Sequence, residues 1–177
     1  MYSQYYSTVE FLPAPKSEDI IDLDQIRSQA NICPTANIDP HKESIFSVYD
    51  VSNELQELYQ SYFDYKVSVR WQVVTESLPI HYDWGVSSDK YLYLIDTGGE
   101  DVKTEFWSAL PDDVVDGGST TTLDRTLICD MHETTHNWFR INVKSPHRVV
   151  NITRPRIALI IRPNVLAFWE RKGPLCP

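Results

Sequence analysis

The sequence predicts a mainly β fold, a sandwich, jelly roll or barrel with helices packed outside it. From Val67 onward the chain consists of short runs rich in Val, Ile, Tyr, Trp and Thr, separated by clusters of Pro, Gly, Asn and Asp. Such runs and breaks are typical of strands and their turns. Apolar residues make up 42% and charged residues 23% of the 177 residues, which favours one folded domain that buries a core without disulfides.

The first part of the chain, residues 1–66, is expected to be helical and irregular and to support the β core. From Val51 to Phe63 the apolar residues recur at helical spacing, with Asp50 or Ser52 available as the N-cap. A second, weaker apolar stripe follows Ser17 and ends before Pro34, because proline stops a helix. The sequence therefore predicts supporting N-terminal α-helices.

Residues 67–163 are expected to form the β core of a single domain that spans 1–177, and residues 164–177 a C-terminal tail. The stretch from Pro111 to Thr122, with three Asp, two Gly and a Ser-Thr-Thr-Thr run, predicts a loop. Seven segments have strand character: Val67–Thr75, Tyr91–Asp96, Lys103–Ser108, Thr120–Ile128, Asn137–Val143, His147–Ile152 and Arg156–Arg162.

Charge and cysteine content narrow the class of protein. The formal charge is −9, from 16 basic and 25 acidic side chains, so a nucleic-acid partner is disfavoured. Three cysteines without C-x-x-C spacing argue against a disulfide framework and against a cysteine-based zinc site. No segment approaches the roughly 18 apolar residues of a membrane span, and the first residues lack a signal-peptide pattern. We therefore expect a cytoplasmic protein without a membrane partner.

A candidate metal site combines residues from two distant segments. His81 and Asp83 are two positions apart, so on an extended chain their side chains point to the same face. His147 opens a later strand-like run. Two imidazoles and one carboxylate are the facial triad of non-haem Fe(II) oxygenases, in which three coordination positions stay open. A 2-oxo acid can take two of these positions, and O2 can take the third.

The order and spacing of these motifs resemble the 2-oxoglutarate/Fe(II)-dependent oxygenase superfamily. The matching features are the H-x-D pair, the run Tyr91–Leu94, the turn Gly98–Glu100 before Thr104–Phe106, and His147 with a basic residue nine positions later. The pattern is similar to the prolyl-hydroxylase-like branch and its small phage and bacterial members, and in part to the aspartyl/asparaginyl hydroxylases. The resemblance covers about residues 78–163 and implies a double-stranded β-helix, a cupin-like jelly roll.

In this family the iron ligands would be His81, Asp83 and His147, and Arg156 would pair with the distal carboxylate of 2-oxoglutarate. An arginine pointed into a barrel needs an anion, and a bidentate carboxylate is a natural partner. A surface pairing of Arg156 with an acidic residue is the alternative, and Arg154 competes for the co-substrate role. Tyr93 is a further candidate for contact with 2-oxoglutarate, with packing in the core as its alternative.

One rival motif is present, because residues 132–136 read H-E-T-T-H, the zinc-protease signature H-E-x-x-H. That chemistry requires both histidines on one helix, with the glutamate as general base. Two β-branched threonines and a strand-like continuation argue against a helix here. Phe139 and Asn142 also stand where the metzincin pattern has glycine and histidine, so the third zinc ligand is missing. A later glutamate such as Glu170 could serve as that ligand, but it lies near the chain end without helical context. A loop or strand edge near the pocket is the preferred interpretation.

The resulting hypothesis is an Fe(II)- and 2-oxoglutarate-dependent dioxygenase. It would hydroxylate an amino-acid or protein side chain or another small molecule, while 2-oxoglutarate and O2 are converted to succinate and CO2. Trp84, Thr104 and Trp138 are candidates for the substrate pocket. A zinc hydrolase of the H-E-x-x-H type and a non-catalytic jelly-roll binding module are the alternatives.

Overall fold

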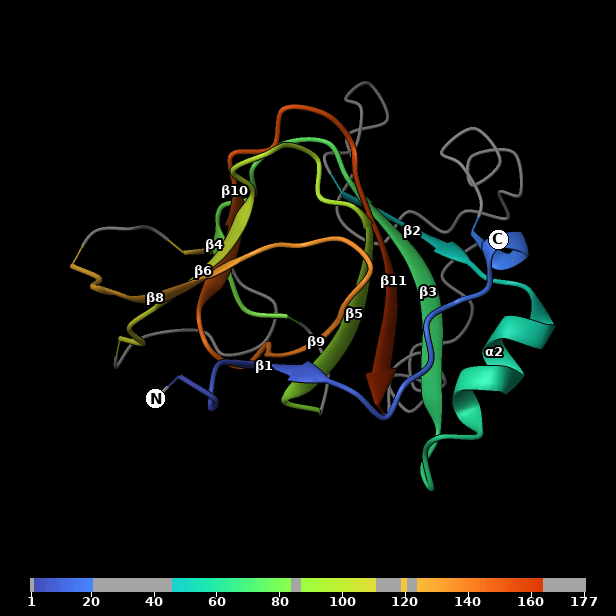
Figure 1. Cartoon of the computed structure of the whole chain (residues 1–177). Coiled ribbons are helices and arrows are strands. Elements are labelled where there is room, and N and C mark those ends of the chain that lie inside the picture. The colour runs from blue at the N-terminus through green and yellow to red at the C-terminus, as the bar shows by residue number, and fades with distance from the viewer. Residues whose placement is uncertain (1, 21–45, 84–86, 111–118, 121–123, 164–177) are drawn as a thin grey trace, which may run out of the picture.

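The computed structural model describes residues 2–20, 46–83, 87–110, 119–120 and 124–163. Within these residues the chain forms two antiparallel sheets that face each other, with one α-helix outside them (Figure 1). The larger sheet has the strand order β1-β9-β5-β11-β3-β2, and the smaller sheet has the order β7-β4-β10-β6-β8. The prediction of a mainly β, two-sheet fold is therefore confirmed.

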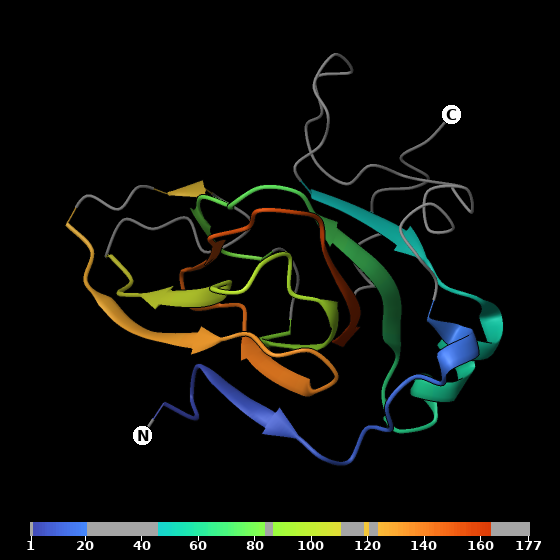
Figure 2. The same ribbon diagram turned by 45° about the horizontal axis from the view of Figure 1, so that its top comes forward.

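The element bounds show that consecutive strands pass from one sheet to the other over much of the chain, which is how a jelly roll is wound (Figure 2). The larger sheet contains β1 (Tyr6–Val9), β2 (Phe46–Asp50), β3 (Val67–Val74), β5 (Asp89–Asp96), β9 (Trp138–Asn142) and β11 (Arg156–Pro163). The smaller sheet contains β4 (Ile80–His81), β6 (Lys103–Trp107), β7 (Ser119–Thr120), β8 (Leu127–His132) and β10 (His147–Val150). The helical elements are η1 (Ser17–Asp19) and α2 (Asn53–Gln60).

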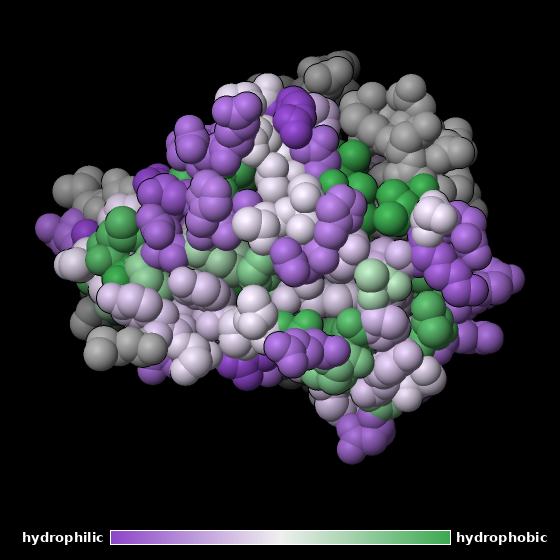
Figure 3. Space-filling model, in the orientation of Figure 1, coloured by the Kyte–Doolittle hydropathy of each residue, from purple (hydrophilic) through white to green (hydrophobic). Residues whose placement is uncertain are grey.

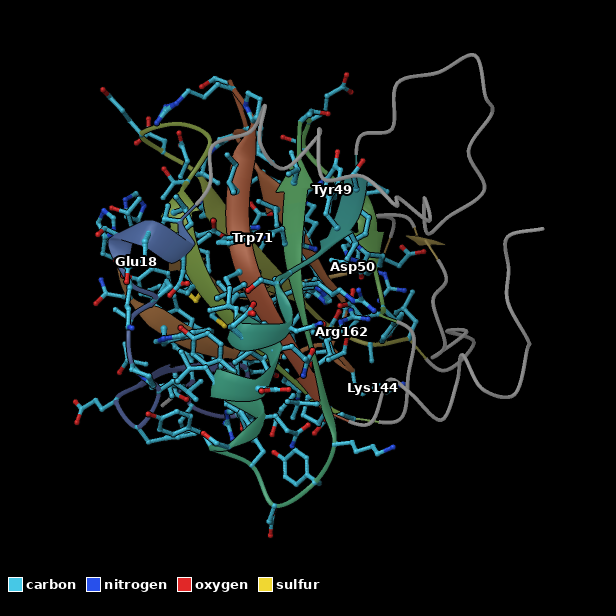
Figure 4. All side chains as sticks on the ribbon, turned by 90° about the vertical axis from the view of Figure 1, so that its right-hand side faces the viewer. Glu18, Tyr49, Asp50, Trp71, Lys144 and Arg162 are labelled. Carbon is cyan, nitrogen blue, oxygen red and sulfur yellow. The ribbon has the colours of Figure 1, made fainter. Side chains whose placement is uncertain are left out.

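The outer face of the larger sheet is covered by α2 and by the N-terminal segment, and Figure 4 looks onto this side. Ser52 caps α2 by accepting a hydrogen bond from the Leu55 amide at 3.2 Å. The helix presents Leu55 and Tyr59 to the sheet, where they belong to the same buried cluster as Trp71. Because burial of large side chains stabilises a fold by about 1.5–3 kcal/mol each, this cluster fixes the helix and the sheet together.

The opposite face of the larger sheet packs against the smaller sheet. This interior cluster contains Leu92 and Leu94 of β5, Ala158 and Ile160 of β11, and Phe106 of β6. Successive residues of β5 and β11 thus alternate between the interior cluster and the outer cluster around Trp71. Both faces of these central strands are therefore buried.

The N-terminal part differs from the sequence prediction. Only α2 is an α-helix among the described residues; Ser17–Asp19 is a single 3-10 turn, and the remainder of that predicted helix lies outside them. Two strands, β1 and β2, also arise from this part and form the two edges of the larger sheet. Of the supporting N-terminal helices that the sequence predicts, the described residues thus show one, α2, together with two short edge strands.

A second difference concerns the predicted strand Thr120–Ile128. The structure has the two-residue β7 ending at Thr120, and a separate strand, β8, beginning at Leu127. β8 pairs with β6 through residues as far as His132. The strand therefore begins later than the threonine run suggested and includes the first residue of the H-E-x-x-H segment.

The surface seen in Figure 3 is mainly hydrophilic or neutral, with apolar residues in small separate patches. No helix in the described residues is long and apolar enough to cross a bilayer.

Candidate metal centre and adjoining pocket

The three predicted metal ligands lie together in the smaller sheet. β10 runs between β4 and β6, and His147 pairs directly with His81 across the β4–β10 ladder. Asp83 follows two residues after His81, and its amide donates a hydrogen bond of 3.2 Å to the Val143 carbonyl. Cross-strand pairing and the two-residue spacing therefore bring the three side chains to one point.

The two imidazoles are oriented by their own backbone. Nδ1 of His81 lies 2.8 Å from the Pro79 carbonyl oxygen, and Nδ1 of His147 lies 2.9 Å from that of Ser145. A carbonyl accepts only from a protonated nitrogen, so Nδ1 carries the proton and Nε2 keeps its lone pair. The Nε2 atoms lie 3.3 Å and 3.6 Å from Oδ1 of Asp83, respectively.

Burial keeps both imidazoles neutral. It lowers the pKa of His81 to about 4, and it lowers the pKa of His147 well below its usual range. The two rings are 4.5 Å apart between centroids, and the neighbouring imidazole further disfavours protonation of His147. Neutral nitrogen is the form that binds metal, so the site favours coordination over protonation.

The second oxygen of Asp83 is held by cations. Oδ2 lies 3.4 Å from Nζ of Lys90 and accepts a hydrogen bond from Nη2 of Arg162. Lys90 is only 5% exposed, and burial lowers its pKa to about 7. The two cations orient the Asp83 carboxylate so that Oδ1 faces the imidazoles.

These residues fit a mononuclear transition-metal ion. One ligand atom from each of His81, Asp83 and His147 lies within 4.8 Å of the others, and this is the only such group found among the described residues. Two imidazole nitrogens and one carboxylate oxygen on one side leave the other coordination positions open. The hydrogen bonds on the far side of each ligand are those that fix ligand orientation in metal sites.

A pocket adjoins this centre between the two sheets. Its lining is Phe46, Gln72, Val74, Leu78, His81, Lys90, Leu92, Thr104, Ile141, His147, Val149 and Arg156. Phe46, Leu78 and His81 are the partly exposed members, and the others are buried. The mouth is therefore formed by Phe46 and Leu78 beside the metal ligand His81, and Lys90, Thr104 and Arg156 lie deeper.

Arg156 reaches this pocket from β11 but is also paired within the protein. Its Nε and Nη2 atoms donate to Oε2 and Oε1 of Glu133 at 2.6 and 2.9 Å. The Thr104 hydroxyl donates to the same Oε1 at 2.7 Å. The side chains of Arg156 and Glu133 are 2% and 0% exposed, so this is a buried, bidentate ion pair and not the surface pairing considered as the alternative.

The sequence analysis gave Tyr93 as a candidate for contact with 2-oxoglutarate, Arg154 as a competitor of Arg156, and Thr104 as a candidate for the substrate pocket. Thr104 does line the pocket, whereas Arg154 is exposed and pairs with Asp96 at 2.9 Å. Tyr93 lies on the opposite face of β5, in the outer cluster, and is absent from the pocket lining. The prediction for Tyr93 was wrong because β5 is buried on both faces, and alternation alone does not tell which face holds the site.

Trp138 was also misplaced by the sequence reasoning. It packs in the outer cluster against Tyr59, with 5.3 Å between ring centroids, and its indole donates to the Pro13 carbonyl at 2.8 Å. It therefore contributes to the core and not to the pocket. Trp84 lies outside the described residues.

The H-E-x-x-H segment does not form the helix that a zinc protease requires. β8 ends at His132, a turn follows, and β9 begins at Trp138. His136 has a backbone φ of 62°, which interrupts any regular helix, and His132 is exposed. Glu133 uses both carboxylate oxygens on Arg156 and Thr104, so the zinc-hydrolase alternative is wrong.

Sequence reasoning missed Lys90 and Glu133 as site residues. Lys90 shares the pocket face of β5 with Leu92, and a lysine two positions before an interior leucine was the available signal. Glu133 pairs with a residue 23 positions away, and nothing in the local sequence indicates such a pairing.

No family model matches the chain, and no curated protein matches it. Similar solved structures include E. coli ycfD, with 9% identity and a TM-score of 0.49 over 92% of this chain and 51% of that chain. A hydroquinone 1,2-dioxygenase, PnpCD, has 14% identity and a TM-score of 0.39, covering 64% and 62%. An oxalate decarboxylase of Bacillus subtilis has 14% identity and a TM-score of 0.40, covering 86% and 35%. The chain thus spans less than two thirds of the length of each of these proteins.

Proposed function

We propose that the protein is an Fe(II)- and 2-oxoglutarate-dependent oxygenase that hydroxylates a C–H bond of an amino-acid or protein side chain or another small molecule. The observation that carries this proposal is a pocket lined by His81 and His147, two members of the His-Asp-His group, and by two buried basic side chains, Lys90 and Arg156. A basic side chain beside Asp83 and a second one on β11 match a ligand with two carboxylates.

The triad supplies the metal ligands. Nε2 of His81, Nε2 of His147 and Oδ1 of Asp83 would hold the ion, and their backbone and cationic partners keep them in place. Bound there, Fe(II) supplies the activation of O2 that couples substrate hydroxylation to decarboxylation of 2-oxoglutarate to succinate. Because Asp83 occupies the carboxylate position, the protein provides three ligands and leaves three positions for co-substrate and O2.

The positions of Lys90 and Arg156 suggest how the co-substrate would be oriented in the pocket. Lys90 lies 3.4 Å from the ligand Asp83 and would bind the carboxylate of the 2-oxo acid nearest the metal. Arg156 lies in the buried part of the pocket and would bind the distal carboxylate. The oxidised substrate would then enter at the mouth, where Phe46 and Leu78 offer apolar contact beside His81.

The pocket walls serve the reaction by excluding water. Nine of the twelve lining residues are buried, and the only partly exposed ones are Phe46, Leu78 and His81. A dry, enclosed site strengthens the charge contacts of Lys90 and Arg156 and protects reactive species from solvent.

The proposal is tested by anaerobic addition of Fe(II) and 2-oxoglutarate to the purified protein. We expect a visible metal-to-ligand charge-transfer band, and succinate on exposure to air. His147→Ala should abolish the band, whereas the matched control His132→Ala, which alters an exposed histidine outside the pocket, should leave it unchanged. A wild-type protein that forms neither the band nor succinate at full iron loading would be a metal-binding jelly roll without this activity.

Arg156→Ala provides a second test of the same site. It should weaken 2-oxoglutarate binding while Fe(II) binding is retained, because Arg156 is not one of the three metal ligands. Equal loss of both would show that the substitution disturbs the whole site.

A further inference from the structure

Glu133, in the H-E-x-x-H segment, forms hydrogen bonds with two residues that line the pocket, Arg156 and Thr104. It is held at the backbone, where its amide donates to the Val102 carbonyl at 3.1 Å. It is absent from the pocket lining, although its partners Arg156 and Thr104 both belong to it. Glu133 therefore lies behind the pocket wall and holds two residues of that wall from the back.

The pairing uses only one edge of the Arg156 guanidinium. Arginine has five N–H donors, in two edges that can each bind a carboxylate. Glu133 accepts from Nε and Nη2, which form one edge. Among the described residues, Nη1 has no hydrogen-bond acceptor. It is also not among the fully buried polar atoms that lack a partner in this part of the chain. The second edge, which contains Nη1, thus faces the pocket that Arg156 lines.

Displacement of Glu133 by a ligand is disfavoured. The carboxylate of Glu133 is completely buried and is bound by the Arg156 guanidinium and by the Thr104 hydroxyl. A ligand that took its place would leave the buried Glu133 carboxylate without its guanidinium partner, which is strongly unfavourable. A ligand carboxylate is therefore expected to bind the free edge of Arg156 while Glu133 stays in place.

We propose that Glu133 is a positioning residue that sets the co-substrate specificity of the pocket. It fixes Arg156 from behind, so that the Nη1 edge meets the distal carboxylate of a 2-oxo diacid and discriminates against 2-oxo monoacids. The inference rests on the proposed function, because it assumes that a 2-oxo acid occupies the pocket. It gives the H-E-x-x-H segment a role that requires neither a helix nor zinc.

The test compares two 2-oxo acids that differ in the distal carboxylate. Anaerobic titrations with Fe(II) would measure dissociation constants of 2-oxoglutarate and of 2-oxobutanoate for the wild type, Glu133→Ala, Glu133→Gln and the control His132→Ala. We expect Glu133→Ala to raise the constant for 2-oxoglutarate about tenfold or more and to leave that for 2-oxobutanoate within about twofold. Fe(II) affinity and the His132→Ala variant should match the wild type.

Glu133→Gln keeps the shape and one carbonyl acceptor but loses the charge, so its effect should have the same direction and be smaller. If Glu133→Ala does not fold, Glu133→Gln and Thr104→Val, which removes the hydroxyl donor to Glu133, carry the test. The proposal is overturned if the variants bind 2-oxoglutarate as the wild type does, bind it more tightly, or lose affinity for both acids equally. Tighter binding would identify Glu133 as a competitor of the ligand.

The outcomes also separate this inference from the proposed function. A wild type that binds neither 2-oxo acid refutes the proposed function and, with it, the role of Glu133. A wild type that binds both acids with equal affinity retains a metal-dependent 2-oxo acid site, and refutes only the specificity assigned to Glu133 and Arg156.

Discussion

Replacing Arg156 should destabilise the protein far more than replacing both members of its ion pair. Arg156→Met leaves the Glu133 carboxylate, whose side chain is 0% exposed, without its guanidinium donors, while the Thr104 hydroxyl still donates to it. Removal of one partner from a buried ion pair costs about 3–5 kcal/mol. In Arg156→Met/Glu133→Leu no charge remains unpaired, and the remaining loss is about 1 kcal/mol for the Thr104 hydroxyl.

The assay is equilibrium unfolding in urea of the metal-free protein at neutral pH, followed by tryptophan fluorescence and circular dichroism. With a slope of roughly 2 kcal/mol per molar urea, Arg156→Met should shift the midpoint down by about 1.5–2.5 M, and the double variant should recover most of this. The reasoning is refuted if Arg156→Met lowers the free energy of unfolding by less than about 1 kcal/mol, or if the double variant loses as much as the two single variants combined.

Three further predictions follow from the same structure. His81→Ala and His147→Ala should each remove the thermal stabilisation produced by Mn(II) in a melting assay, whereas His132→Ala should retain it; retention by His147→Ala would place the ion elsewhere. Because burial lowers the pKa of His81 to about 4 and lowers that of His147 as well, the unfolded chain binds more protons between the unfolded value of about 6.5 and these lowered values. Stability of the metal-free protein should therefore fall as the pH is lowered across that window, by on the order of 1 kcal/mol per pH unit for each histidine. In urea unfolding at pH 7 and pH 5, His81→Gln should show a smaller difference in the free energy of unfolding between the two pH values than the wild type. Gly98→Ala should cost about 1–3 kcal/mol, because Gly98 has φ +83° and an added Cβ would lie 2.8 Å from both the Arg154 carbonyl oxygen and Cβ of Arg156; an unchanged melting temperature would contradict this.

The sequence predicted those parts of the site that depend on local geometry. The H-x-D spacing places His81 and Asp83 on one face of an extended segment, and this holds wherever the segment lies in the fold. His147 was identified by its residue type at the start of a strand-like run, and the pairing of β4 with β10 brings it opposite His81. Arg156 was predicted to point inward, and it does.

The remaining features depend on contacts between distant segments. Tyr93 and Lys90 lie on opposite faces of the same buried strand, and the sequence has no polar face to distinguish them. Glu133 occurs in a motif that is usually helical. Here the 62° φ of His136 places the segment in a turn, and Glu133 pairs with the distant Arg156. The edge strand β1 contains only four residues, Tyr6–Val9, and is formed by pairing with β9.

The direct pairing of His81 with His147 also has a mechanical consequence. β4 has only two residues, and a single residue pair joins it to β10, with backbone hydrogen bonds from the Leu78 amide to Val149 and from the Asp83 amide to Val143 on either side. An ion bound by both Nε2 atoms would act as a staple between the strands, as a disulfide does in other sheets. Release of the ion would then remove a side-chain cross-link between the strand that carries His81 and β10.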